Sequence, residues 1–506
     1  MKRKILSAVL VAAMAVGMMT GCGDSKDSNS SKATEKETLG DTKAQLSSPD
    51  YEFEKEYTFG DFNAHSNNDM ERQGGIDTFE DTDIVYQDIS YDQLMYLLQQ
   101  EGNYMIQLTG SWCHNSRAMS PSVNEFAKEY GVDTIYTYDF NINNADDGSL
   151  FVRMTNGTDT PGTKLNYMYG EMVSRYLTNL NDWVAYPADS DSALSYTNAE
   201  GKEVTVAKLQ QPFLFLYNKD NTVDNSGSGN GSKACPIVYA FEEMVERDAK
   251  GIYVKEKDDE GNDVLDKDGN PVRTYITDEF NERLKVIFDY IKNNNIQIST
   301  YSKADYMREA FNAYGQEIFG ADTQINLYPI TYREAGWLMG QDGNALILFG
   351  GPSSEGTRAV APILNEYAVK NNLRIYMYDI RVDGGYTTDQ WGYTQTTSIL
   401  DEDSILSGMY TELLDKYLTN LEAGHSMENG DPLIQVPYLF AYNKDAQDED
   451  GFIAPVMAYC ELPYVQNPEM RYCINTEKNR TACKESIMTV LQSYAEHTGI
   501  EVQDIQ

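Results

Sequence analysis

The stretch of sequence that decides the fold is YMIQLTGSWCHNSRAMSP, residues 104–121. A mostly apolar run, Tyr104–Leu108, leads into Gly110, and an amphipathic pattern follows that continues through Pro121. This order predicts a buried strand that ends at a turn and a helix that begins there. Cys113 lies at the predicted start of the helix, where free backbone N–H groups and the helix dipole favour a thiolate. The turn is therefore suited to thiol chemistry.

The same pattern occurs a second time, 241 residues later in the chain. Residues 84–132 align with residues 325–373 without a gap, with 15 identities in 49 positions. Farther along, QQPFLFLYNKD (210–220) recurs as QVPYLFAYNKD (435–445), with 8 of 11 positions identical. Agreement of this extent does not arise by chance, so the chain contains a duplicated unit.

Each copy has the same order of predicted elements. A short strand, a helix and a buried strand are followed by the helix after the turn, a third strand and a further helix. An antiparallel hairpin and a last helix close the unit. This order is typical of an α/β fold in which helices flank a mixed sheet. We therefore predict two tandem domains of this class, at 51–300 and 301–506.

The turn at Cys113 resembles the active-site motif of the thioredoxin superfamily, WCxxC, which opens a helix that contains a proline. Trp112, Cys113 and Pro121 match this motif, whereas Ser116 takes the place of the second cysteine. The resemblance implies a thioredoxin-like fold for both copies, with Pro121 and Pro362 inside their helices. It also implies that Cys113 is the nucleophile, that Ser116 holds the resolving position, and that Trp112 flanks the thiol on a binding surface.

Two further prolines match the cis-proline of that superfamily. Pro212 and Pro437 each open an apolar strand that leads into a hairpin. The resemblance implies that the bonds Gln211–Pro212 and Val436–Pro437 are cis. It also implies that an extended peptide binds alongside these residues through backbone hydrogen bonds, which requires no cysteine.

Departures from the motif limit the chemistry that is expected. A single thiol can attack a partner's disulfide and hold the partner as a mixed disulfide, but Ser116 cannot complete an internal disulfide. Gln107 stands where the superfamily has a buried proton-relay acid, and the second copy has Ser354 and Thr357 in place of both cysteines. Any redox activity is therefore predicted for the first copy. Two interpretations of Cys113 stay open: a reactive thiol, or a remnant in a domain kept for binding.

The beginning of the chain has the pattern of an export signal. A basic start is followed by the apolar run Ile5–Met19 and by Gly21-Cys22. This resembles a bacterial lipoprotein signal, which implies that residues 1–21 are removed and that Cys22 carries acyl chains such as palmitate. The protein would then be anchored in the cell membrane on its extracytoplasmic face. The polar, Ser-rich residues that follow, within 22–50, are predicted to form a flexible tether.

Charge excludes nucleic-acid binding, and the spacing of the histidines gives little support for metal catalysis. The chain has 40 Lys+Arg and 79 Asp+Glu, a formal charge of −39, and such a polyanion is repelled by phosphate backbones, so no nucleic-acid partner is expected. Its 4 His lie far apart, with no spacing typical of a metal site. We therefore predict no metal and no cofactor.

Four cysteines remain besides Cys22 and Cys113. They are Cys235, Cys460, Cys473 and Cys483. In an exported protein some of them are expected to be paired, and the last three are close in sequence. One pair among these three leaves an odd thiol, and the sequence does not say which.

The sequence as a whole favours a membrane-tethered, thioredoxin-like lipoprotein that handles disulfides as a monothiol or binds client proteins. Its expected partners are extracytoplasmic proteins that carry thiols or disulfides, and extended peptides. Whether it is an enzyme stays open. Two alternatives remain: a solute-binding lipoprotein that serves a transporter, and a non-enzymatic scaffold of the cell envelope.

Overall fold

The computed structural model describes most of the chain after the predicted tether. The described residues are 84–110, 112–143, 149–229, 234–245, 254–255, 257–258, 260–265, 269, 273–274, 276–467, 472–474 and 477–505. The predicted signal, Cys22 and the tether lie outside them. Across these described ranges, no helix has the length and apolar character needed to span a membrane.

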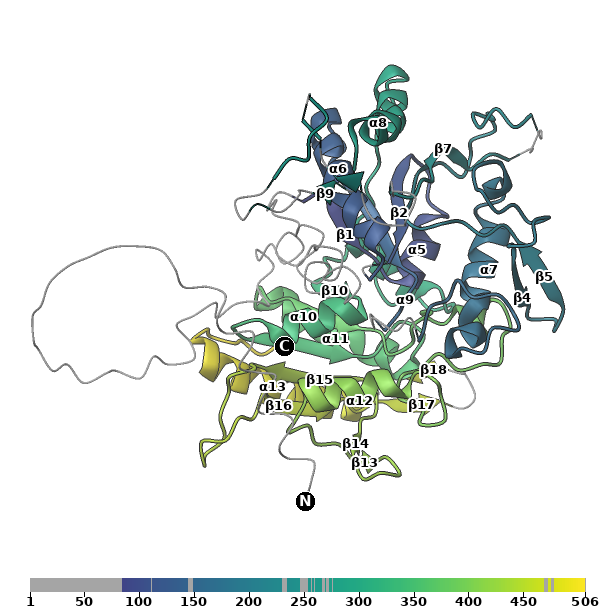
Figure 1. Cartoon of the computed structure of the whole chain (residues 1–506). Coiled ribbons are helices and arrows are strands. Elements are labelled where there is room, and N and C mark those ends of the chain that lie inside the picture. The colour runs from purple at the N-terminus through teal and green to yellow at the C-terminus, as the bar shows by residue number, and fades with distance from the viewer. Residues whose placement is uncertain are drawn as a thin grey trace, which may run out of the picture. The chain divides into compact units, whose positions relative to one another are not determined.

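The first sheet has five strands in the order β1-β3-β2-β6-β7. Strands β1, β2 and β7 are labelled in Figure 1. They are β1 (Tyr86–Asp88), β2 (Tyr104–Thr109), β3 (Ile135–Asp139), β6 (Phe213–Tyr217) and β7 (Ile237–Phe241). Strands β1, β3 and β2 are parallel, whereas β6 pairs antiparallel with both β2 and β7. The helices of this repeat are α5 (Tyr91–Leu97), α6 (His114–Tyr130), α7 (Asn166–Arg175) and α8 (Asp278–Asn293).

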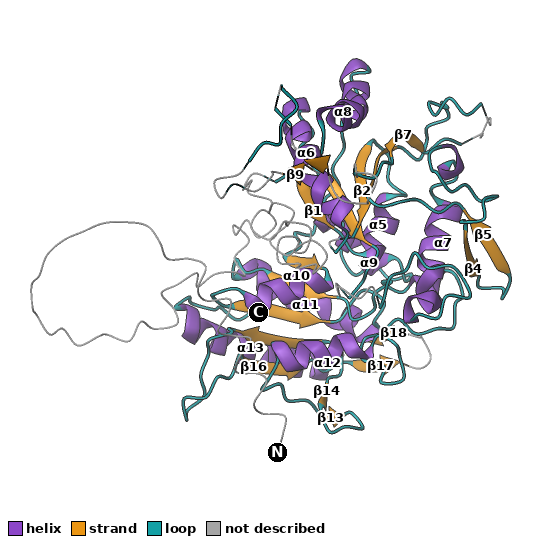
Figure 2. Cartoon of the chain, viewed as in Figure 1, coloured by secondary structure: helices purple, strands orange, loops and turns teal. Residues whose placement is uncertain are grey.

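The second sheet repeats this arrangement, with the order β10-β12-β11-β15-β16. Its strands are β10 (Leu327–Ile330), β11 (Ala345–Phe349), β12 (Ile375–Tyr378), β15 (Tyr438–Tyr442) and β16 (Val456–Glu461). The strand directions are the same as in the first sheet. The helices are α9 (Lys303–Asn312), α10 (Tyr332–Gly340), α11 (Glu355–Lys370), α12 (Ser407–Lys416) and α13 (Glu477–Thr498). The prediction of mixed sheets flanked by helices is thus confirmed (Figure 2).

Short elements lie in the connections. The two-stranded pairs are β4 (Leu194–Thr197) with β5 (Glu203–Val206), β8 (Val254–Lys255) with β9 (Arg273–Thr274), β13 (His425–Ser426) with β14 (Pro432–Leu433), and β17 (Val465–Asn467) with β18 (Tyr472–Ile474). Three short helical turns are η1 (Pro161–Leu165), η2 (Leu180–Asp182) and η3 (Tyr386–Gln390).

The prolines singled out in the sequence lie as predicted. Pro121 is inside α6 and Pro362 is inside α11, so each helix continues through its proline. The bonds Gln211–Pro212 and Val436–Pro437 are both cis. The alignment of the two copies is therefore correct at these positions.

Equivalent residues start equivalent helices in the two repeats. Ser90 caps α5 and Thr331 caps α10, and each forms a reciprocal capping box with the third residue of its helix, Gln93 and Glu334. A capping box satisfies two backbone N–H groups that a helix end would otherwise leave unpaired. Hydrogen bonds within the capping box thus set the residue at which each of these helices begins.

One hydrophobic cluster joins the two repeats. It includes Leu94 and Met168 from α5 and α7 of the first repeat, and Leu338 and Met409 from α10 and α12 of the second. The opposite face of each sheet has a cluster of its own, under α6 and α8 in the first repeat and under α11 and α13 in the second. Burial of a large apolar side chain contributes about 1.5–3 kcal/mol, so the shared cluster holds the sheets together. A division into two separate domains at residue 300 stays a prediction.

A buried ion pair also crosses between the repeats. Arg333, the second residue of α10, binds Asp88 at the end of β1 and Asp139 at the end of β3, with 3.1 Å between its Nη1 and Oδ2 of Asp139. Thr331 donates its hydroxyl to Asp88 at 2.9 Å. The Arg333 side chain is 8% exposed and both carboxylates are 4% exposed. Removal of one partner from such a group leaves uncompensated buried charge.

We expect Arg333→Leu to lower the free energy of unfolding by about 3–5 kcal/mol, because two carboxylates then remain buried without their counter-ion. Equilibrium denaturation by urea measures this. Arg480→Leu is the matched control, since Arg480 pairs with Glu366 at 3.3 Å on the surface, where both side chains are at least 40% exposed. The control should lose no more than about 1 kcal/mol. Equal losses in the two variants would contradict a central role for Arg333.

Candidate functional site

The thiol of Cys113 lies where β2 gives way to α6. Cys113 is the N-cap residue of α6, and its side chain makes no capping hydrogen bond. Its Sγ atom is 3.8 Å from the carbonyl oxygen of Gln211, the residue before cis-Pro212. The fold therefore brings together the predicted nucleophile and the predicted peptide-binding residues, which are 98 positions apart in sequence.

Cys113 is much less accessible than the sequence motif suggests, because it is only 6% exposed. The Trp112 ring packs edge-on against Phe151, with 5.5 Å between the ring centroids. The guanidinium carbon of Arg153 lies over the Phe151 ring, 5.3 Å from the ring centroid. The guanidinium also donates a hydrogen bond to the carbonyl oxygen of Leu209. The segment that includes Phe151 and Arg153 thus lies against the turn that carries the thiol.

Arg153 is a site residue that sequence reasoning missed. Burial lowers the pKa of its guanidinium, while the nearby Tyr169, Cys113 and Glu242 act in the opposite direction. The Glu242 carboxylate accepts a hydrogen bond from the backbone N–H of Ala185 at 2.7 Å. A cation therefore lies within electrostatic reach of the thiol. Its position 40 residues beyond the motif, in an irregular connection, gave no sequence signal.

Gln107 takes part in a neutral chain of hydrogen bonds beneath the turn. Tyr86 donates its hydroxyl to Oε1 of Gln107 at 2.7 Å, and Nε2 of Gln107 donates to the Ser120 hydroxyl at 3.2 Å. Ser120 in turn donates to the carbonyl oxygen of Ser116 at 2.7 Å. Burial raises the pKa of the Tyr86 phenol above its ordinary value. No member of this chain is therefore an acid that can exchange a proton near neutral pH.

Several buried polar atoms close to the thiol have no hydrogen-bond partner among the described residues. Both amide atoms of Gln211, which is 2% exposed, belong to this set, and so does the hydroxyl of Ser116, which is 0% exposed. Buried polar groups are normally satisfied, and exceptions concentrate where water or a ligand binds. The Gln211 amide also lies beside Gly110, where an added Cβ would be 2.6 Å from its Nε2.

The equivalent turn of the second repeat contains no thiol. Ser354 is the N-cap residue of α11, and its hydroxyl accepts a hydrogen bond from the N–H of Thr357 at 3.2 Å. Pro437, after Val436, lies against this turn, where a Cβ on Gly356 would be 3.0 Å from the proline ring. Ser354 therefore caps a helix, which is a structural role.

The remaining cysteines are less suited to react. Burial raises the pKa of Cys460 and of Cys483 to about 12. Both are free thiols, so no disulfide joins these two. The side chain of Cys473 lies outside the described residues, but because Cys460 and Cys483 are both free, the pair expected among these three cysteines does not form.

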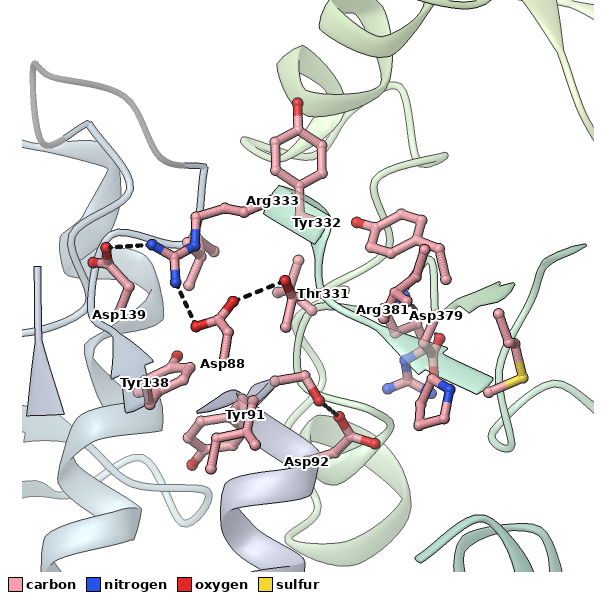
Figure 3. Close-up of a pocket in the computed structure, with 18 of the residues that line it drawn as sticks. Asp88, Tyr91, Asp92, Tyr138, Asp139, Thr331, Tyr332, Arg333, Asp379 and Arg381 are labelled. Carbon is pink, nitrogen blue, oxygen red and sulfur yellow. Dashed lines mark hydrogen bonds and ion pairs between the residues drawn. The ribbon is translucent and has the colours of Figure 1, made fainter. Parts of the chain in front are cut away.

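A cavity of about 70 Å³ lies between the two repeats (Figure 3). Its lining comes from positions that the duplication relates: Tyr91 corresponds to Tyr332, and Tyr138 to Tyr378. The two tyrosine pairs have nearly the same geometry, with ring centroids 6.0 and 6.1 Å apart and 55° between the planes in both. The equivalent faces of the two repeats therefore meet around this cavity.

The charges around the cavity break this symmetry. The position of Arg333 in the second repeat is held by Asp92 in the first, and Asp92 lines the cavity together with Asp379. Burial, then the charge of Asp92, raises the pKa of Asp379 to about 7. Burial also raises the pKa of Asp92, against hydrogen bonds that its carboxylate accepts from Ser90 and Tyr306. Sequence reasoning missed Asp92 and Asp379, although the alignment of the two copies places the acidic Asp92 opposite the basic Arg333.

Comparisons with known proteins add little to this geometry. No protein-family model and no curated protein matches the sequence. Among solved structures, the chain is similar to form I of ERdj5, with 9% identity over 80% of this chain and a TM-score of 0.16. It is similar to zinc-bound human ERp44, with 9% identity over 68% of this chain and 63% of that chain and a TM-score of 0.14. The chain spans 30% of the ERdj5 chain. Likeness at these scores carries no argument about fold or function.

Replacement of Phe151 by Ala should make Cys113 more reactive, because the ring that packs against Trp112 is lost. We expect the rate constant for alkylation of Cys113 by iodoacetamide to rise several-fold at neutral pH. Mass spectrometry of tryptic peptides measures the rate for each cysteine in one sample. Cys483 is the internal control and should be unaffected. An unchanged rate at Cys113 would show that this segment does not limit access.

Asp379→Asn should change how stability depends on pH. Because the folded-state pKa of Asp379 is raised to about 7, its contribution is full below the unfolded pKa of about 4 and is lost as pH rises through 7. Wild type should therefore lose up to about 4 kcal/mol of unfolding free energy between pH 4 and pH 8 that the variant keeps. Urea denaturation at both pH values tests this, with the exposed Asp450→Asn as control. Identical pH profiles in wild type and Asp379→Asn would contradict the burial of this carboxyl.

Proposed function

We propose that the chain is a thioredoxin-like lipoprotein whose first repeat binds extracytoplasmic client proteins beside Cys113 and captures them as mixed disulfides. The observation that carries the proposal is the position of this thiol. Cys113 opens α6 directly after a buried parallel strand, and its sulfur lies 3.8 Å from the carbonyl oxygen of Gln211, before cis-Pro212. The second repeat has Ser354 at the same place.

The strand order supports a thioredoxin-like domain in each repeat. In both sheets the middle of the five strands, β2 or β11, has two strands parallel to the sheet direction on one side and an antiparallel pair on the other. In both, the helix that contains a proline begins at the end of the central strand. We place the domain boundaries at 51–300 and 301–506.

The proposed chemistry is one thiol–disulfide exchange. The thiolate of Cys113 attacks one sulfur of a client disulfide, a new S–S bond forms, and the other client sulfur leaves as a thiolate that takes a proton from solvent. The guanidinium of Arg153 lies within electrostatic reach of the Cys113 sulfur. Ser116 has no thiol to release the client, so the mixed disulfide should persist until an external thiol attacks it.

Client binding would use the polar groups around cis-Pro212. The amide of Gln211 offers a buried donor and a buried acceptor without partners in the described part of the chain. An extended peptide needs one donor and one acceptor at each residue that it pairs. Phe151 and Arg153 would have to move away from the turn for a folded client to reach the thiol, since Cys113 is nearly buried.

Membrane attachment is proposed from the sequence alone. Acylation of Cys22 would hold the folded part at the extracytoplasmic face of the cell membrane through the polar tether. The large negative charge of the chain does not favour binding to an anionic bilayer by charge, so the lipid would provide the anchor.

A mixed-disulfide capture experiment tests the proposal. Tagged full-length protein is expressed in its own envelope, thiols are quenched with acid and alkylating agent, and partners are recovered under denaturing conditions. We expect covalent partners that dissociate on reduction, and we expect Cys113→Ala to lose them.

Cys460→Ala is the matched control and should keep the partners, because its thiol has a pKa of about 12 and reacts slowly. If wild type and Cys113→Ala recover the same partners, or if neither recovers any, the disulfide-exchange proposal fails.

A further inference from the structure

We propose that the cavity between the two repeats is a binding site for a small primary ammonium compound. The site is separate from Cys113, and the proposal does not depend on thiol chemistry. It rests on three observations: an excess of buried carboxylates, buried hydroxyl groups without partners, and an aromatic lining.

The first observation is the charge of the lining. Asp88 and Asp139 share the guanidinium of Arg333, which compensates one of their two negative charges. Asp92 and Asp379 line the same cavity but form no ion pair within the described residues. Two facing carboxylates in a buried site repel each other unless a proton or a cation lies between them.

Arg381, the other guanidinium in the lining, is directed elsewhere. It binds Asp389 at 3.1 Å and lies 3.8 Å from Asp383, and it donates to the hydroxyl of Thr388. For Asp379 it provides mainly its backbone N–H, at 3.0 Å from Oδ1. The cavity therefore has an excess of negative charge at the end formed by Asp92 and Asp379, which favours a cationic ligand and disfavours an anion.

The second observation concerns hydroxyl groups. Tyr138 and Tyr378 both line the cavity and are only 5% and 3% exposed, and neither hydroxyl has a hydrogen-bond partner in the described ranges. Oδ2 of Asp379 is also buried without a partner there. An orphaned buried polar group destabilises the folded state. A primary ammonium carries three N–H donors and no acceptor, which suits a lining of hydroxyl and carboxylate oxygens.

The third observation is the aromatic lining. Five tyrosines border the cavity, two from the first repeat and three from the second; they are Tyr91, Tyr138, Tyr306, Tyr332 and Tyr378. Aromatic rings attract cations through their faces, and such linings recognise ammonium groups. The volume of about 70 Å³ is well below the several hundred Å³ of sites for drug-sized ligands. The ligand is therefore expected to be small, with a short alkyl chain.

Isothermal titration of the full-length protein with ethylammonium chloride tests the proposal. We expect saturable binding at a stoichiometry of one, together with a rise in Tm as ligand is added. Potassium chloride at the same ionic strength, sodium acetate and tetramethylammonium chloride should give no saturable heat. Potassium tests for a simple cation site, acetate tests for anion binding, and tetramethylammonium lacks N–H donors.

Variants connect binding to the cavity. Asp379→Asn and Asp92→Asn should each weaken ethylammonium binding at least tenfold, and the exposed Asp450→Asn should leave it unchanged. Circular dichroism establishes that each variant is folded. The proposal is overturned if ethylammonium gives no saturable heat, if Asp379→Asn binds it as wild type does, or if potassium or tetramethylammonium binds equally well. In the first case the cavity holds water only.

Discussion

The arrangement of the two repeats depends on one buried cation. Arg333 reaches from α10 of the second repeat to Asp88 and Asp139, which end two neighbouring parallel strands of the first sheet. This contact fixes the carboxyl ends of β1 and β3 against the start of α10. The shared hydrophobic cluster and the cavity lined by tyrosines both lie around it. Without it, Asp88 and Asp139 would be buried with no counter-ion.

Function in this chain is proposed to come from divergence between equivalent positions. The duplication placed the same strand, turn and helix in both repeats, and later substitutions made the two copies different. At the turn, Cys113 lies against the carbonyl oxygen of Gln211 in one repeat, while Ser354 caps a helix in the other. At the interface, Arg333 binds Asp88 and Asp139, while its counterpart Asp92 adds a negative charge that raises the pKa of Asp379. These differences give rise to the proposed reactive thiol at Cys113 and to the proposed cation-binding site in the cavity.

The sequence predicted the features that depend on local patterns. The order of elements along each copy and the helices that continue through Pro121 and Pro362 followed from periodicity and from agreement between the copies. Both cis bonds were implied by the resemblance to the thioredoxin superfamily. Contacts made by tertiary packing were not predictable. Arg153 approaches the thiol from a long irregular connection, and its role requires knowledge of how that connection folds back. The cavity could not be predicted because its lining depends on how the two repeats are oriented, and the sequence pattern of one copy contains no information about this.

The most direct test of this account is the reactivity of each cysteine in the folded, full-length protein as a function of pH. A limiting amount of a small aromatic disulfide is added between pH 6 and pH 9, and mass spectrometry counts the mixed disulfide formed at each position. The account predicts that Cys113 forms it first at neutral pH, whereas Cys460 and Cys483, whose pKa values are about 12, lag far behind. If Cys113 reacts no faster than those two across this range, it is a remnant, and the first repeat is not a site of disulfide exchange.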